Sequence, residues 1–159
     1  MYIKNIVKNW FIKYKRTGGK FMEKTKEKAL KLANKKIVFV GSVNENNVPN
    51  IKVMVVAKHH GLKTFYFAST HSAMRTEHYK RNFNACLYFN GGPVYKGLML
   101  EGIMKIFNDV DIKELIWKNS FRNPFKNGGI DDPDCCVLIF TAKKGRYHHW
   151  FKTEVFEID

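Results

Sequence analysis

The sequence predicts a mainly β, antiparallel barrel with a few helices, built as one domain. Several short runs rich in β-branched and aromatic residues are separated by turn sequences, as expected for short antiparallel strands. The chain has 159 residues, enough to bury one core without disulfides or metals. In so short a chain, full or partial barrel closure is the simplest way to remove exposed strand edges.

The net positive charge lies mainly in the first 36 residues. Residues 1–36 contain 12 Lys and Arg and two acids, whereas residues 37–159 contain 16 and 12. A total charge of +14 would favour a nucleic acid or an anionic surface as partner if it covered the folded body. Because the body is only mildly basic, we expect no nucleic-acid binding from it.

Residues 1–21 are predicted to be a basic extension with two alternative interpretations. Apolar residues at helical spacing, with lysines between them, predict an amphipathic helix on an anionic membrane: Ile3, Ile6, Val7, Trp10, Phe11 and Tyr14. Alternatively, the extension is a translated leader, because Gly18–Met22 back-translates into a ribosome-binding sequence before a start codon. We favour the leader, with residues 22–159 as the domain, and expect a chain beginning at Met22 to fold.

The first half of the domain is predicted to be a helix, three strands and a second helix. Residues 24–34 are rich in Lys, Glu, Ala and Leu, which favours a helix. The strands are predicted at residues 36–43, 50–58 and 62–68. Turn sequences separate them, so we expect an antiparallel meander. Residues 72–81 have helical composition and lack Pro and Gly.

The second half is predicted to return to strands. They are expected at residues 85–89, 97–107, 136–141 and 147–158. Asp109 is expected to open a helix whose apolar surface includes Leu115 and Ile116. Residues 119–134 are rich in Asn, Gly, Pro and Asp and are expected to form a loop with short helical turns.

Cysteine and hydropathy patterns argue for a reducing, cytoplasmic location. The three cysteines are an odd number without a C-x-x-C spacing, so neither a disulfide framework nor a zinc site is predicted. Cys86 is expected in the core. The apolar runs are too short to cross a bilayer, and the first residues lack a signal-peptide pattern. The pairs His59-His60 and His148-His149 do not predict a metal site, because neighbours on a strand face opposite sides.

One segment carries the chemistry of a phosphate site. After the strand residues Phe65–Ala68, three hydroxyls and one guanidinium converge where a helix begins: Ser69, Thr70, Ser72 and Arg75. The alternative is that one hydroxyl is simply the helix N-cap and Arg75 a solvated surface cation. Taken alone, the segment favours this alternative.

The order of the segments resembles the pyridoxamine 5'-phosphate oxidase-like, FMN-binding split-barrel family, particularly its general stress protein branch. The similarity runs from Glu23 to the C-terminus and is carried by four stretches: residues 43–52, 65–82, 96–102 and 129–134. It implies a Greek-key-like split β-barrel. It also implies a homodimer with FMN in a groove at the subunit interface. We expect Leu98, Leu100 and Ile103 to supply contact surface for the second subunit.

The resemblance also implies positions for the cofactor contacts. Lys52, the only charge between Pro49 and Ala57, would face the flavin, and Val53, Met54 and Val55 would pass backbone groups along its ring. Ser69, Thr70, Ser72 and Arg75 would hold the phosphate. The implied function is that of an FMN-dependent oxidoreductase, with a small molecule or a nicotinamide cofactor as electron donor. No residue is assigned as catalytic.

Departures from the family leave alternatives open. Gly97 stands where pyridoxamine phosphate oxidases have a flavin-contacting Gln, and Arg146-Tyr147-His148 lacks the Trp-Gln element that precedes the similar Arg-Leu-His. Oxidation of vitamin B6 is therefore not expected. One alternative is a stress protein that binds flavin or another cofactor without turnover. The other is a basic nucleic-acid or membrane-surface binding module.

Overall fold

The computed structural model describes residues 19–92, 95–117 and 129–159, in which eight strands form one antiparallel sheet. The helices are α2 (Gly19–Ala33), α3 (Met74–Arg81), α4 (Val110–Ile116) and the short 3-10 helix η2 (Gly129–Asp131). The strands are β1 (Ile37–Val43), β2 (Pro49–Val55), β3 (Lys58–His60), β4 (Thr64–Thr70), β5 (Asn84–Asn90), β6 (Lys96–Phe107), β7 (Cys135–His149) and β8 (Lys152–Glu157). The mainly β, antiparallel prediction is confirmed.

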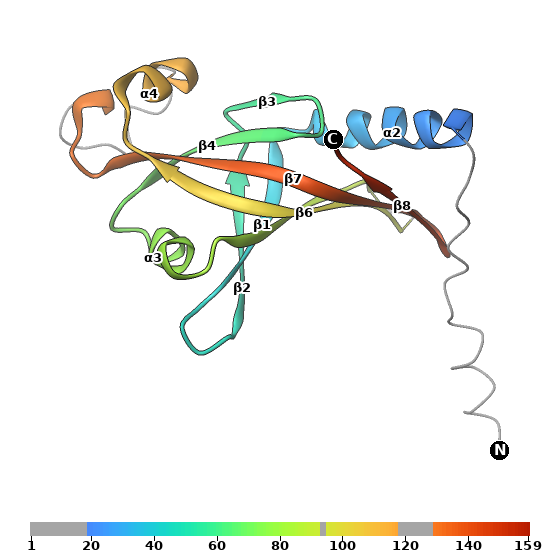
Figure 1. Cartoon of the computed structure of the whole chain (residues 1–159), viewed down its shortest axis with the longest axis horizontal. Helices are drawn as coiled ribbons and strands as arrows, with labels where there is room; N and C mark the ends of the chain where they lie inside the picture. Colours follow the sequence, from blue (N-terminus) through green and yellow to red (C-terminus); the bar gives the residue numbers. More distant parts are fainter. Residues whose placement is uncertain (1–18, 93–94, 118–128) are drawn as a thin grey trace.

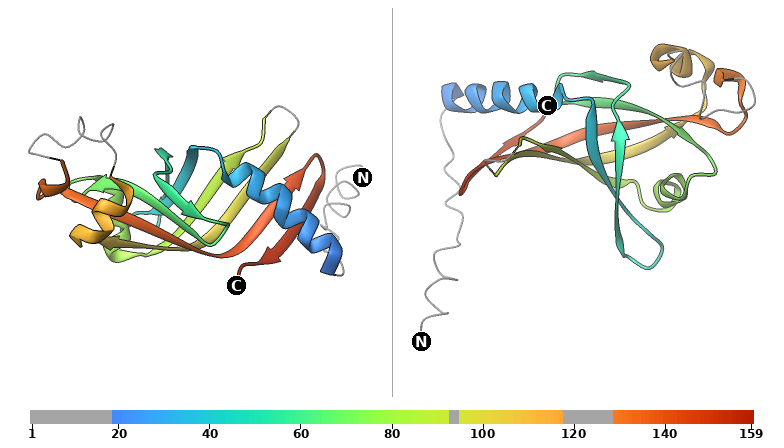
Figure 2. Two further views of the ribbon diagram at one scale, coloured as in Figure 1. Left: turned by 90° about the horizontal axis from the view of Figure 1, so that it is seen from above. Right: turned by 180° about the vertical axis from the view of Figure 1, so that it is seen from behind.

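The sheet is curled around two long strands. Its order is β2-β1-β5-β6-β7-β4-β3, and β8 pairs with the end of β7. β6 and β7 run along the whole molecule, with α3 and α4 at one end and α2 at the other (Figure 1). The same arrangement is visible from above in Figure 2. Within the described residues, no helix combines the length and apolarity needed to cross a bilayer.

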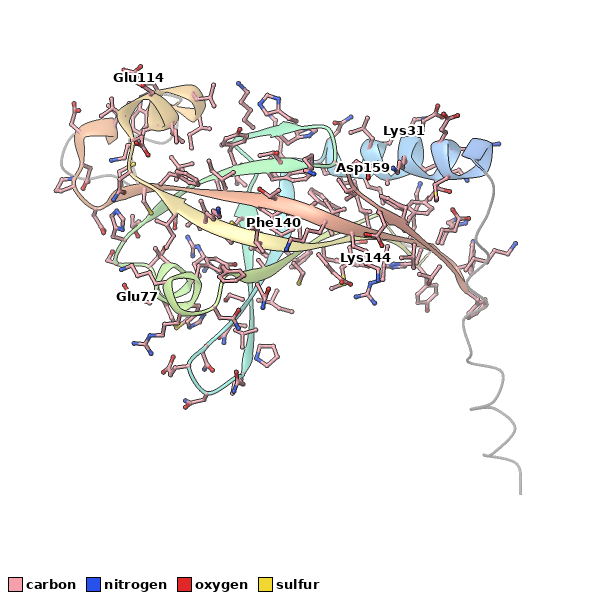
Figure 3. All side chains as sticks on the ribbon, in the orientation of Figure 1. Lys31, Glu77, Glu114, Phe140, Lys144 and Asp159 are labelled. Atoms are coloured by element: carbon pink, nitrogen blue, oxygen red, sulfur yellow. The ribbon has the colours of Figure 1, made fainter. Side chains whose placement is uncertain are left out.

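The core fills the inside of the curl with aromatic and branched side chains. Alternate residues of β4 and β5 point inward, and the fully buried ones include Phe65, Phe67, Leu87 and Phe89. Phe140 in the middle of β7 adds a fifth large side chain (Figure 3). The interior is therefore packed with side chains, and a ligand of flavin size must bind outside it.

Two strand predictions are wrong. The predicted meander forms only in its first step: β1 pairs with β2 as expected, but β4 lies between β3 and β7 in the sheet and not beside β2. The break expected between the strands at 136–141 and 147–158 is also absent, because β7 is one strand of 15 residues and the chain turns at Trp150-Phe151 instead. A Cβ on Gly145 would lie 2.4 Å from the ring of the buried Phe156. Gly145 therefore provides space for a core ring and does not mark a turn.

Three further expectations about side-chain direction are wrong. Leu98 and Leu100 are fully buried in the core, so neither can contact a second subunit. Cys86, expected in the core, lies on the opposite face of the sheet and is only partly buried. The inward residues of β5 are its neighbours Ala85 and Leu87, because side chains alternate along a strand.

Substituting Gly145 by alanine is expected to destabilise the fold by about 1–3 kcal/mol, because the added methyl group overpacks the Phe156 ring. Urea unfolding should show a lower midpoint with an unchanged slope. Lys143→Ala, two residues earlier and exposed, is the control and should leave the midpoint nearly unchanged. Equal midpoints for wild type and Gly145→Ala would show that Phe156 moves aside without cost.

Candidate functional site

The loop between β4 and α3 brings several hydroxyl groups together. The Thr76 hydroxyl donates a hydrogen bond of 2.8 Å to the carbonyl oxygen of Thr70. It also lies 3.4 Å from the hydroxyl of Ser69, whose side chain is buried. The Ser69 hydroxyl therefore faces the inside of the loop. The N-cap of α3 is Ala73 and makes no side-chain capping bond, so none of the predicted hydroxyl residues caps this helix.

Asp134, which precedes β7, accepts several hydrogen bonds from the β4–α3 loop. Its carboxylate accepts 2.8 Å and 2.6 Å hydrogen bonds from the backbone N–H and the hydroxyl of Ser72. Its carbonyl oxygen accepts a further one from the N–H of His71. The hydrogen bond from the Ser72 hydroxyl is the main reason that the pKa of Asp134 lies below its usual value. Both the N–H and the hydroxyl of Ser72 are thus already hydrogen-bonded to the Asp134 carboxylate.

Ser72→Ala is expected to raise the pKa of Asp134 toward its ordinary value, because the largest stabiliser of the carboxylate is removed. A carboxylate whose pKa is depressed by folding stabilises the fold above the unfolded pKa, about 3.9, and loses that effect as the pH falls through the folded value. The variant should therefore lose less stability on acidification. A carboxyl NMR titration measures the shift, and an unchanged Asp134 pKa would contradict this role of Ser72.

Arg75 lies in the first turn of α3, and its guanidinium is partly desolvated. Among the described residues it takes part in no ion pair, and its Nε is buried without a hydrogen-bond acceptor. Burial lowers the pKa of Arg75 from its usual value, but a guanidinium stays protonated at neutral pH. A desolvated cation with an unsatisfied donor, beside an uncapped helix start, is suited to an anion.

The four predicted residues of β2 are divided between the two faces of the sheet. Met54 points into the core, opposite Val38, and is buried. Val53 and Val55 point outward and are about half exposed. Lys52 shares the inner face with Met54, but its side chain is exposed.

β1 lies between β2 and helix α3, which follows the hydroxyl-rich loop, and contacts both. The Tyr79 hydroxyl of α3 donates a 3.1 Å hydrogen bond to the carbonyl oxygen of Gly41, and His78 lies 2.9 Å from the hydroxyl of Ser42. On its other edge β1 pairs with β2, where Lys52 lies opposite Val40. Figure 1 shows α3 beside the β1–β2 hairpin. β2, which carries Lys52, and α3, which carries Arg75, are thus both hydrogen-bonded to β1.

The outer side of β1 and β2 is an unusual apolar surface, which we call the apolar sheet face. Its members are 37% to 74% exposed and are Ile37, Phe39, Ile51, Val53 and Val55. They lie opposite one another across the strand pair, with Phe39 against Val53 and Ile37 against Val55. Ile37, Phe39 and Ile51 were not among the site residues predicted from the sequence. Their signal was the unbroken apolar runs of β1 and β2, which are typical of strands covered on both faces.

The same side of the sheet continues toward a paired Tyr and His. Phe39 lies 6.5 Å from Tyr88, measured between ring centroids, and the Tyr88 hydroxyl is 3.1 Å from Nε2 of His148. Burial, followed by the charge of Arg146, lowers the pKa of His148, so the imidazole is neutral at pH 7. A Cβ on Gly97 would lie 2.4 Å from the Tyr88 hydroxyl. Gly97 therefore leaves the space in which this pair forms.

Comparisons with known proteins identify the family. The family model described as "Pyridoxamine 5'-phosphate oxidase like" matches residues 23–156. A Clostridium acetobutylicum protein related to general stress protein 26, of the pyridoxinephosphate oxidase family, is 40% identical; the match covers 86% of this chain and 96% of that one, with a TM-score of 0.77. No curated protein sequence matches significantly.

Two more distant structures share the fold. General stress protein 26 from Bacillus anthracis is 16% identical over 86% of this chain and 98% of its own, with a TM-score of 0.69. A heme-binding protein from Mycobacterium smegmatis is 11% identical over 84% of this chain and 57% of its own, with a TM-score of 0.67. The chain therefore belongs to the pyridoxamine 5'-phosphate oxidase-like family, in the branch of general stress protein 26, and its fold is the split barrel of that family.

Proposed function

We propose that the protein is an FMN-binding flavoprotein that acts as a homodimeric oxidoreductase. The observation that carries the proposal is Arg75, whose guanidinium is partly desolvated and whose Nε lacks an acceptor. A buried donor without a partner costs free energy, and an anionic ligand removes that cost. The residues at the start of α3 therefore fit a phosphate group.

The contacts within the β4–α3 loop reduce the number of residues that are available to bind the phosphate. Ser69 faces Thr76, and Ser72 is bonded to Asp134, whose charge would repel a phosphate at that point. We therefore assign the phosphate to Arg75 and Thr70, with Lys52 beside the cofactor as a further cation. FMN would supply the hydride and electron chemistry. The protein would bind it, orient it and stabilise its negative charge.

The apolar sheet face supports a second subunit. Its five side chains expose a contiguous hydrophobic surface that a monomer would leave in water. A second copy that packs on this face would bury it and could complete a groove for the flavin, because ligand sites bury most of the ligand. We propose this face, and not Leu98 and Leu100, as the dimer interface.

An absorption spectrum of the natively purified protein tests the proposal. Bound FMN gives the visible bands of a flavin, and release of free FMN on denaturation identifies it. A Soret band without flavin would instead indicate heme, the ligand named for the Mycobacterium smegmatis neighbour. No chromophore, and no binding in an FMN titration, would contradict the proposal.

Turnover is tested separately. Bleaching of the flavin bands by a nicotinamide cofactor under anaerobic conditions, with recovery in air, supports the oxidoreductase. A tightly bound flavin that no donor reduces would instead favour the non-catalytic binding protein. Binding of DNA without flavin would favour the charge-driven alternative.

A further inference from the structure

Two neighbouring turns expose three large aromatic side chains at one end of the sheet. The β5–β6 turn ends with Tyr95, which is 73% exposed, and the β7–β8 turn consists of Trp150 and Phe151, which are 52% and 98% exposed. The rings of Tyr95 and Trp150 are 6.2 Å apart between centroids. We call these three residues the aromatic tip. Clustered exposed rings are typical of a surface that contacts something else.

The backbone conformation at the aromatic tip disfavours large side chains, in addition to the cost of exposing aromatic rings to water. Trp150 and Tyr95 have φ values of 55° and 44°, in the left-handed region that bulky side chains rarely adopt. Trp150-Phe151 is a two-residue hairpin turn with positive φ at its first position, where glycine is the preferred residue. The sequence thus has two aromatic residues where both backbone conformation and exposure oppose them. Their side chains therefore indicate a contact outside the chain.

Positive charge surrounds the aromatic tip. Lys96 and Lys152 begin β6 and β8 next to it, and no ion pair among the described residues includes either. The Nζ of Lys35 donates a 2.6 Å hydrogen bond to the carbonyl oxygen of Asn90 at the end of β5, which adds a third ammonium nearby. Glu154, the nearest acid along β8, accepts a hydrogen bond from Thr25. The partner of the aromatic tip is therefore expected to be anionic.

Helix α2 begins at the same end of the molecule. Figures 1 and 2 both show the start of α2 at the end of the molecule that carries the β7–β8 turn. Residues 1–18, which lie outside the described residues, contain five Lys and Arg and no acid. Residues 1–18 directly precede Gly19, so this basic segment joins the described part of the chain at the end that carries the aromatic tip (Figure 1).

We propose that the aromatic tip docks this end of the protein onto an anionic lipid surface. Trp and Tyr prefer the membrane–water interface, where the ring is partly desolvated and the polar atom stays hydrated. Lysines near an anionic leaflet add electrostatic attraction that falls off within a Debye length. The combination gives reversible surface binding without a spanning segment.

The test uses the full chain and sedimentation with vesicles of phosphatidylglycerol and phosphatidylcholine, or of phosphatidylcholine alone. The double substitution W150G/F151N places glycine at the position of positive φ, so it should raise the urea midpoint while reducing partition onto the anionic vesicles by at least about tenfold. Phe83→Ala removes another exposed aromatic ring, at the opposite end of β5, and should change neither quantity. Binding of wild type to neutral vesicles should be much weaker.

Several results would overturn the proposal. Unchanged partition of W150G/F151N would show that the aromatic tip does not touch lipid, as would partition lost only when Lys4, Lys8 and Lys13 are replaced by glutamine. If the double substitution instead dissociates the protein or weakens flavin binding, the tip is covered by a second copy or by the cofactor. Equal binding to both vesicle types would exclude an anionic partner.

Discussion

Replacing Val53 by aspartate is expected to convert the protein from dimer to monomer over the micromolar concentration range. Val53 lies at the centre of the apolar sheet face, opposite Phe39. A carboxylate there would be buried without a partner in the dimer, at a cost of about 3–5 kcal/mol, but it would stay hydrated in the monomer. The dimer dissociation constant should therefore rise by more than about 100-fold. Analytical ultracentrifugation over a dilution series measures it.

Val48 provides a matched control on the same hairpin. It is 52% exposed, against 51% for Val53, but it lies in the turn between β1 and β2, outside the apolar sheet face. Val48→Asp should therefore leave the dimer intact. Because a shared site couples the two equilibria, Val53→Asp should also weaken FMN binding. A Val53→Asp protein that dimerises as tightly as wild type would show that the interface lies elsewhere.

Arg75→Ala is expected to weaken FMN binding by about 1.5–3 kcal/mol, or about 10- to 150-fold, without unfolding the protein. The side chain makes no ion pair within the described residues, so the main loss is its contact with the phosphate. Flavin fluorescence titration gives the affinity. Riboflavin, which lacks the phosphate, should bind the variant and wild type equally well.

Arg81 is the control for this prediction. It lies on the same helix and its side chain is 64% exposed, with a 3.9 Å contact to Glu45. Arg81→Ala should leave FMN affinity unchanged, because an exposed pair of this kind contributes little. Arg75→Lys should recover only part of the affinity, since a point charge does not replace two parallel donors. Equal FMN affinities for wild type and Arg75→Ala would exclude Arg75 as the phosphate ligand.

Local patterns were sufficient for most elements of the fold. The β-branched runs before Val43 and before Thr70 predicted β1 and β4, and the Pro- and Gly-free stretch predicted α3. The break expected between residues 141 and 147 does not form, although this stretch contains Gly145: glycine is common in turns, but it also makes room for a ring from another strand. The sequence does not distinguish these two uses, because the ring belongs to Phe156.

The sequence by itself determined the family, the antiparallel barrel class and the position of Arg75 just after a hydroxyl-rich loop, because these depend on residue order and short-range pattern. Only the tertiary structure decided which side of each strand is buried. It turned Leu98 inward and Phe39 outward, since those directions depend on how the whole sheet curls. It also brought Asp134 to Ser72, 62 residues earlier in the chain, through the pairing of β4 with β7. Contacts between residues this far apart in the sequence arise when distant strands pair, and no local pattern encodes them.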